Sequence, residues 1–179
     1  YSKIHLVPFA EYDLFPAFFH PLSKLNINID RGNFKAGDNY TIFEFNDLLF
    51  SNLICYESSI PDVSRKFVEQ GAEFLVIQAN DGWLKGSYGP NQHFELARLR
   101  AIENRVPIIR SANTGISGVI SQDGSIQNKI NIDQEKIIME RVNLSESGSF
   151  YTKFGDIFAL FCFLITSIFT LYSCKERFL

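Results

Sequence analysis

Cys55 is the residue of this sequence best suited to nucleophilic chemistry. It ends the apolar run Leu53-Ile54-Cys55 and is followed by Tyr56-Glu57 and then by a predicted helix. A thiol at a turn from strand to helix lies near a helix N-terminus, whose dipole lowers thiol pKa values and whose backbone N–H groups can stabilise an oxyanion. The position suits a catalytic cysteine, but on position alone a buried structural cysteine, the commoner case in proteins, is the simpler interpretation.

Two charged residues near the start of the sequence could assist such a thiol. Lys3 and Glu11 flank the mostly apolar segment at residues 5–9. A lysine ammonium beside a thiolate favours the anion and can stabilise a tetrahedral oxyanion. Taken alone, both residues are more simply interpreted as solvated surface charges, and Glu57 could simply cap the helix that follows Cys55.

The polar segment Asn80-Asp81-Gly82-Trp83 lies just after an apolar run at residues 74–78. That run is predicted to be a buried strand, and polar loops after strands commonly form binding sites in α/β folds. The segment carries the single tryptophan of the chain. It is therefore a candidate binding loop, although an ordinary Asn-Asp-Gly turn would have the same composition.

Composition argues against several classes of function. The 179 residues carry 17 basic and 20 acidic side chains, and the net charge of −3 argues against a nucleic-acid binder. The three cysteines and three histidines are scattered along the chain, so neither a disulfide framework nor a zinc site is expected. We expect no metal, no cofactor and no nucleic-acid partner.

The order of the predicted elements indicates one α/β domain over residues 1–149. The turn Asn46-Asp47 separates the first two of the predicted strands, which lie at residues 40–45, 48–55, 74–78, 107–111, 116–121, 126–130 and 136–144. Helices are predicted at residues 60–70 and 90–105. Pro61 suits the first turn of the former and Gly71 its C-cap, whereas Pro107 ends the latter. This alternation predicts sheets covered by helices.

Residues 150–179 form a separate C-terminal part, in which residues 157–174 carry no charge. At about 1.5 Å per residue, a helix of that length is roughly 27 Å long, close to the hydrocarbon thickness of a bilayer. Lys175 and Arg177 follow, and the positive-inside rule places them in the cytoplasm and residues 1–149 on the periplasmic side of the inner membrane. We expect a transmembrane helix with a short cytoplasmic tail, with a buried core helix as the alternative.

Five segments, taken in order, resemble the apolipoprotein N-acyltransferase family of the nitrilase superfamily. They lie at residues 1–12, which include His5-Leu6-Val7-Pro8-Phe9, at 53–57, at 80–83, at 89–93 with 97–103, and at 110–117. The likeness covers nearly the whole chain with compatible spacing, and the predicted C-terminal span completes the family's plan. It implies an α/β fold, a nitrilase-like αββα sandwich without its N-terminal strands, plus one C-terminal transmembrane helix.

The resemblance implies catalytic roles for four residues. Cys55 would be the nucleophile, Lys3 the lysine that stabilises the oxyanion, and Glu11 and Glu57 supporting carboxylates. The family's reaction moves an acyl chain from a phospholipid onto the thiol and releases a lysophospholipid. The thioester then acylates the α-amino group of a diacylglyceryl-cysteine at a lipoprotein's N-terminus, so that covalent catalysis splits the transfer into two easier steps.

The resemblance also implies substrate-binding roles for Tyr56, Trp83 and Asn80. The implied partners are a phospholipid acyl donor, a diacylglyceryl-modified apolipoprotein acceptor and the membrane. The superfamily's general base is a glutamate upstream of the lysine, at a position that would precede Tyr1 of this sequence. Three interpretations stay open: part of such an acyltransferase, a membrane-tethered amidase of the same superfamily, and a truncated domain without activity of its own.

Overall fold

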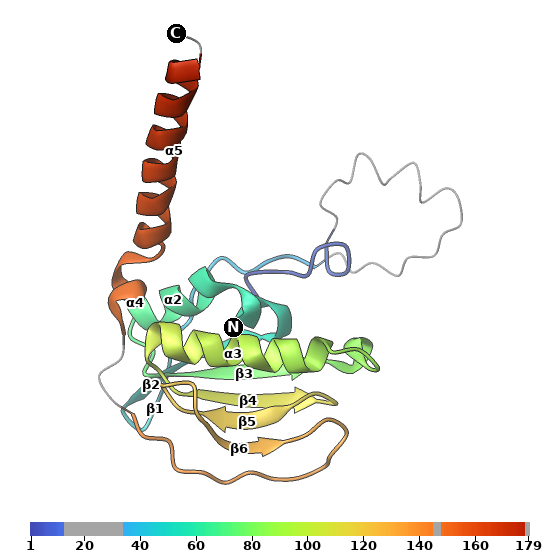
Figure 1. The fold of residues 1–179 in the computed structure, drawn as a ribbon. Helices are drawn as coiled ribbons and strands as arrows, with labels where there is room; N and C mark the ends of the chain where they lie inside the picture. Colours follow the sequence, from blue (N-terminus) through green and yellow to red (C-terminus); the bar gives the residue numbers. More distant parts are fainter. Residues whose placement is uncertain (13–33, 145–147, 178–179) are drawn as a thin grey trace.

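The computed structural model describes residues 1–12, 34–144 and 148–177, centred on one mixed sheet (Figure 1). Its six strands lie in sequence order: β1 (Phe43–Phe45), β2 (Leu48–Ile54), β3 (Phe74–Asn80), β4 (Ile108–Asn113), β5 (Ser117–Ile120) and β6 (Ile126–Ile130). β2, β3 and β4 are parallel, whereas β1, β5 and β6 pair antiparallel with their neighbours. The carboxyl ends of the three parallel strands therefore meet at one edge of the sheet.

Two helices connect the parallel strands and lie on one face of the sheet (Figure 1). α2 (Pro61–Glu69) lies between β2 and β3, and α3 (Gly89–Asn104) lies between β3 and β4. A short 3-10 helix precedes each of them: η2 (Cys55–Ser59) begins directly after β2, and η3 (Gly82–Leu84) follows β3. Both 3-10 helices thus stand at the carboxyl edge of the sheet.

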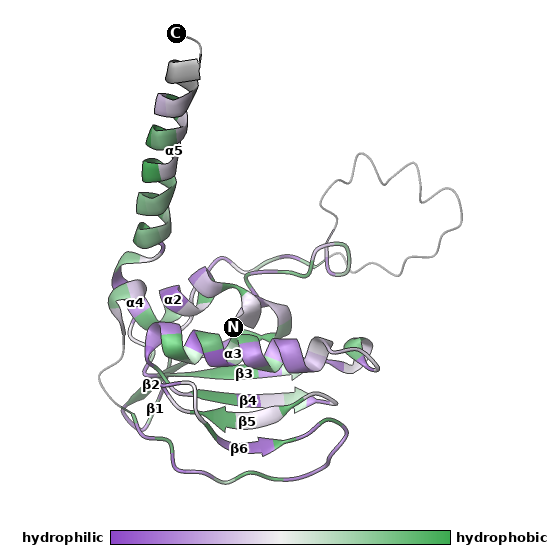
Figure 2. Cartoon of the chain, viewed as in Figure 1, coloured by the Kyte–Doolittle hydropathy of each residue, from purple (hydrophilic) through white to green (hydrophobic). Residues whose placement is uncertain are grey.

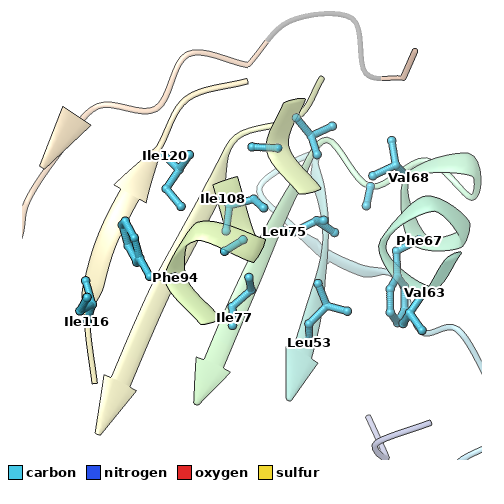
Figure 3. Close-up of a cluster of buried hydrophobic side chains, with 14 residues drawn as sticks. Leu53, Val63, Phe67, Val68, Leu75, Ile77, Phe94, Ile108, Ile116 and Ile120 are labelled. Atoms are coloured by element: carbon cyan, nitrogen blue, oxygen red, sulfur yellow. The ribbon is translucent and has the colours of Figure 1, made fainter. Parts of the chain in front are cut away.

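The core lies between the sheet and these two helices (Figure 3). Phe67 of α2 and Phe94 of α3 pack with aliphatic side chains from the three parallel strands, namely Leu53, Leu75, Ile77 and Ile108. All six are at most 1% exposed. Since burying one such side chain is worth roughly 1.5–3 kcal/mol, this cluster firmly fixes the strands whose ends carry the polar loops.

Local sequence signals explain most element boundaries, which differ from the predicted ones by a few residues at most. Pro61 occupies the first turn of α2, and Gly71 has φ 105°, a left-handed conformation that favours glycine after a helix. The β1–β2 connection is the expected hairpin, because Asn46 and Asp47 have φ values of 49° and 62°. α3 ends at Asn104, ahead of Pro107, as expected.

The strand predicted at residues 136–144 is wrong, because that segment has no regular secondary structure. Ile137 is 94% exposed and Met139 is 91% exposed. An alternating apolar pattern supplies side chains for a sheet face, but a strand also needs backbone partners. Among the described residues, β6 pairs with β5, and Asn128 of β6 meets this segment through a side-chain bond to Glu140.

The described residues account for one sheet and one helical layer of the expected αββα sandwich. The sheet face opposite α2 and α3 carries a stack of aromatic rings, in which Phe50 lies between Phe43 and Phe74 with ring centroids 5.3 and 5.1 Å apart. Part of this apolar face is half-buried, and no second sheet among the described residues covers it. The α/β architecture is confirmed to that extent.

The C-terminal part is helical, as expected. α4 (Phe150–Phe154) packs near α2 and α3, and α5 (Ile157–Arg177) extends away from the body as an apolar rod (Figures 1 and 2). The side chains of residues 157–173 are exposed, apart from the half-buried Ser167. Among the described residues, no helix has the length and apolarity needed to cross a membrane.

Candidate active site

The Cys55 thiol is presented by a strained turn at the carboxyl edge of the sheet. β2 ends at Ile54, and Cys55 begins η2 with φ 55°, in the left-handed region that a non-glycine residue rarely adopts. Ile54 pairs with Gln78 of the parallel strand β3, so the two strands end side by side. The Cys55 Sγ atom consequently lies 4.0 Å from the carbonyl oxygen of Asn80.

Glu57 joins this turn to the N-terminal segment. Its side chain is fully buried and accepts hydrogen bonds from Ile54 N at 2.6 Å and from Tyr1 Oη at 2.9 Å on one oxygen. The other oxygen accepts from Ile4 N at 2.9 Å and from His5 N at 3.3 Å. Burial, together with the charge of the Glu57 carboxylate, raises the pKa of Tyr1 above its ordinary value. Glu57 is therefore a structural hub between residues 1–5 and the end of β2.

Lys3 and Glu11 form a compact ion pair within the N-terminal segment. Lys3 Nζ donates to both carboxylate oxygens of Glu11, at 2.9 and 2.7 Å, and Val7 N donates to Glu11 Oε2 at 2.7 Å. The Lys3 side chain is 10% exposed. Within the described residues no hydrogen bond joins Lys3 to the Cys55 thiol. The link between them runs through Glu57, which holds Ile4, the neighbour of Lys3.

The predicted binding loop folds back on the same edge. Asn80 Oδ1 accepts from Gly82 N at 3.1 Å, and the Trp83 indole donates to the Asn80 carbonyl at 2.9 Å. That carbonyl is the one beside the Cys55 thiol. The Trp83 side chain nevertheless stays 63% exposed. The loop therefore brings an aromatic ring and a thiol to one place.

A largely apolar pocket of about 330 Å³ opens beside the thiol. Cys55, Tyr56, Trp83, Leu84 and Leu96 are among its lining residues. Of the residues singled out from the sequence, Cys55, Tyr56 and Trp83 line this pocket. The supporting hydrogen bonds described above involve the three residues Lys3, Glu11 and Glu57. Asn80 contacts Cys55 through its backbone.

Sequence reasoning missed a buried ionic network beside the pocket. His93 Nδ1 lies 2.8 Å from Asp81 Oδ1, and Arg110 Nη2 donates to Asp81 Oδ2 at 2.8 Å. Burial raises the pKa of Asp81, but the hydrogen bond with His93 and the charge of Arg110 together hold it below its ordinary value. Their positions in three separate segments of the resemblance were the available signal, but nothing in their spacing indicated contact.

A metal centre is not indicated by the part of the chain that the structure describes, where no three His, Cys, Asp or Glu side chains cluster suitably. The chemistry available at the site is that of a thiol. It comprises a half-exposed cysteine, an apolar pocket, and buried charges that fix the surrounding loops. Such a set suits covalent acyl chemistry at Cys55.

Known proteins similar to this chain include enzymes named apolipoprotein N-acyltransferase. That of Geobacter metallireducens is 38% identical over 161 residues, which are 90% of this chain and 30% of the relative. That of Chlorobaculum tepidum is 33% identical over 183 residues, which cover 99% of this chain and 34% of the relative. The chain thus spans about a third of the length of the curated relatives it matches.

A similar fold occurs in the crystal structure of a carbon-nitrogen hydrolase from Helicobacter pylori G27. The TM-score is 0.53 at 20% identity, and the match covers 57% of this chain and 43% of that one. At that identity the likeness concerns the fold. The model of the carbon-nitrogen hydrolase family matches residues 1–151, which include the whole sheet and every site residue discussed above. This chain therefore belongs to the carbon-nitrogen hydrolase family.

Proposed function

We propose that the protein containing this chain is an apolipoprotein N-acyltransferase that uses Cys55 as its nucleophile. The observation that carries the proposal is the half-exposed Cys55 thiol on a strained turn beside an apolar pocket. The named relatives, at 38% and 33% identity over most of the chain, support the same reaction. The acyl donor is a phospholipid, and the acceptor is the α-amino group of a diacylglyceryl-cysteine.

The proposed acyl transfer proceeds in two steps. The Cys55 thiolate attacks the ester carbonyl of the phospholipid, a thioester forms, and the lysophospholipid alkoxide leaves with a proton. The acceptor amine then attacks the thioester, an amide forms, and the thiol is released. A negatively charged tetrahedral intermediate occurs in both steps, and a preorganised cation stabilises such an oxyanion.

In this proposal Lys3 supplies that cation, and Glu11 orients it through the two short contacts of their ion pair. Glu57 keeps the lysine segment and the nucleophile turn in register, because it bonds to the backbone of both. The thiol proton passes to a glutamate upstream of Lys3 in the complete protein, as the family resemblance implies.

Tyr56 and Trp83, together with the loop that Asn80 orders, receive the acyl chain in the apolar pocket. Each methylene group transferred from water into the pocket contributes roughly 0.8 kcal/mol to binding, so the pocket should bind a long acyl chain more tightly than a short acyl group. An acyl chain held there would carry its carbonyl carbon to the adjacent Cys55 thiol. The pocket volume of about 330 Å³ is at the small end of ligand sites, which suits a slender chain.

The placement of α5 in the inner membrane is part of the same proposal, with residues 1–149 as the periplasmic catalytic domain and residues 150–179 as anchor and tail. It rests on the uncharged sequence of residues 157–174, since no helix of the described residues meets the length and apolarity of a span by itself. Its apolar side chains are exposed, and the hydroxyls of Thr166 and Thr170 bond to carbonyls of their own helix, as lipid requires. α4 fixes the exit point, because Thr152 Oγ1 donates to Asn104 at 3.1 Å and its carbonyl accepts from Arg65.

The decisive experiment is mass spectrometry of the full-length protein after incubation with phospholipid vesicles. The proposal expects an acyl adduct on the peptide that contains Cys55, and loss of that adduct when a diacylated lipopeptide is added, with the lipopeptide gaining the chain. Loss of the adduct to water without lipopeptide would instead support the amidase interpretation. No adduct in the full-length protein would refute the proposal.

The membrane placement has its own test, which is labelling of intact spheroplasts with an impermeant thiol reagent. A cysteine introduced by Lys153→Cys, at an exposed position of α4, should react. A cysteine introduced at Phe178, which lies outside the described residues, should react only after the membrane has been permeabilised. The opposite pattern would overturn the proposed orientation, whatever the outcome for Cys55.

A further inference from the structure

One imidazole connects a buried ion pair to the turn that presents Cys55. On one side of the ring, His93 Nδ1 lies 2.8 Å from Asp81 Oδ1, and Asp81 is paired with Arg110. On the other side, His93 Nε2 lies 3.0 Å from Ser58 Oγ and 3.2 Å from the Cys55 carbonyl oxygen. The ring therefore spans the space between the ends of β3 and β4 and the 3-10 helix η2.

The turn needs such a support because its backbone is strained. Cys55 has φ 55°, and a non-glycine residue in that region costs on the order of 1 kcal/mol or more unless its surroundings hold it there. The Cys55 carbonyl accepts from Ser58 Oγ at 2.7 Å, a bond made within the turn itself. Among the described residues, His93 is the side chain that offers this carbonyl a bond from outside the turn.

The other end of the link is rigid. Asp81 and Arg110 are each 2% exposed, and Arg110 Nε also donates to the Ile116 carbonyl at 3.0 Å. A Cβ added at Gly115 would lie 2.2 Å from Asp81 Oδ2, so this carboxylate is enclosed at close quarters. A charge pair that is excluded from water is a firm anchor, because its hydrogen bonds are strengthened by the low local dielectric.

We propose that His93 is a positioning residue that ties the Cys55 turn to the Asp81–Arg110 ion pair, a role that rests on the proposed function of Cys55. Either tautomer links the turn to the ion pair. With its hydrogen on Nε2, the ring donates to the Cys55 carbonyl, and Nδ1 accepts from Arg110 Nη2, which lies 3.1 Å away. With its hydrogen on Nδ1, the ring donates to Asp81, and Nε2 accepts the Ser58 hydroxyl hydrogen in place of the Cys55 carbonyl. In both arrangements the ring holds the turn, and with it the direction of the thiol.

Two substitutions at His93 separate this role from simple space filling. His93→Gln places its amide where Nε2 stood and can both donate and accept, so it keeps the bond to the turn. His93→Asn places its amide where Nδ1 stood, so it keeps the bond to Asp81 and loses the turn. Glu95→Asp, which also removes one methylene, is the matched control on an exposed position of α3.

The measurement is the rate of alkylation of Cys55 by iodoacetamide in the full-length protein, read by mass spectrometry of the Cys55 peptide and divided by the rate in denaturant. We expect His93→Gln and Glu95→Asp to stay within about threefold of wild type, and His93→Asn to change the rate by about tenfold, the factor that corresponds to losing one hydrogen bond. Equal rates for His93→Asn and His93→Gln would overturn the proposal.

A second variant covers the case in which His93→Asn does not fold. Ser58→Ala removes a hydroxyl from the same link without altering the ring, and we expect it to change the alkylation rate by about three- to tenfold. An unchanged rate in Ser58→Ala would then refute the link. Because alkylation needs neither lipid nor lipopeptide, these outcomes are independent of whether acyl transfer itself is observed.

Discussion

Glu57 offers the sharpest test of how the N-terminal segment is fastened to the nucleophile turn. Its two carboxylate oxygens accept from four donors, which belong to Ile54, Tyr1, Ile4 and His5. In Glu57→Gln an amide nitrogen must replace one of these oxygens. If it replaces the one facing Ile4 and His5, two backbone N–H groups lose their acceptor. If it replaces the other, the Tyr1 hydroxyl can turn and accept a hydrogen bond from the new amide, but the Ile54 N–H loses its acceptor.

The magnitude follows from these contacts. A hydrogen bond to a charged group contributes about 1.5–3 kcal/mol, and leaving a buried donor unsatisfied costs about 1–3 kcal/mol. The better amide orientation loses the 2.6 Å bond from Ile54 N and weakens the remaining bonds, since the charge has gone. We therefore expect Glu57→Gln to destabilise the local structure by about 3 kcal/mol, which is roughly a hundredfold in an opening equilibrium.

Amide hydrogen exchange of the full-length protein, resolved by peptide, measures this opening directly. Peptides that cover residues 1–8 and 48–58 should exchange roughly a hundredfold faster in Glu57→Gln, because both segments lose the same anchor. Glu11→Gln is the matched control. Since Glu11 bonds within the N-terminal segment, to Lys3 and Val7, it should speed exchange there and leave residues 48–58 unchanged. Wild-type exchange of residues 48–58 in Glu57→Gln would refute the reasoning.

Three further outcomes follow from the site. Cys55→Ala and Cys55→Ser should both abolish acyl transfer in a lipopeptide assay while leaving the circular dichroism spectrum unchanged, because a serine hydroxyl lacks the low pKa of a thiol; substantial turnover by either would remove Cys55 from its role. The pKa of Asp81 in the folded state lies below its ordinary value of 3.8, so the stability that its carboxylate contributes is fully present above that pH and is lost as the pH falls through the folded-state pKa. Asp81→Asn should therefore reduce the fall of the unfolding temperature at acid pH. Gly115→Ala should lower the free energy of unfolding by about 1–3 kcal/mol in the same assay, because the new methyl group overlaps the Asp81 carboxylate, and an unchanged value would show that the carboxylate can move.

Local signals were sufficient for most of the fold. The β1–β2 hairpin was predictable because Asn46 and Asp47 tolerate left-handed backbone conformations, and α2 because Pro61 and Gly71 mark its two ends. Cys55 could be placed at a turn from strand to helix for a similar reason, since an apolar run stops there and a helix start follows. Its left-handed φ was not predictable, because nothing local requires it and distant groups hold it.

The failures share a cause, which is dependence on partners far away in the sequence. A strand at residues 136–144 required a neighbouring strand, and its own alternating pattern could not supply one. Glu57 looked like a helix cap, and it does bond to Ile54 N at the start of η2, but Tyr1, Ile4 and His5 share the same carboxylate from more than fifty positions away. Because β2 and β3 end at one edge of the sheet, the topology brings residues that are distant in the sequence within hydrogen-bonding distance there. The contacts of His93 have the same origin, because its imidazole meets Asp81 and the Cys55 carbonyl, which lie 12 and 38 positions away in the sequence.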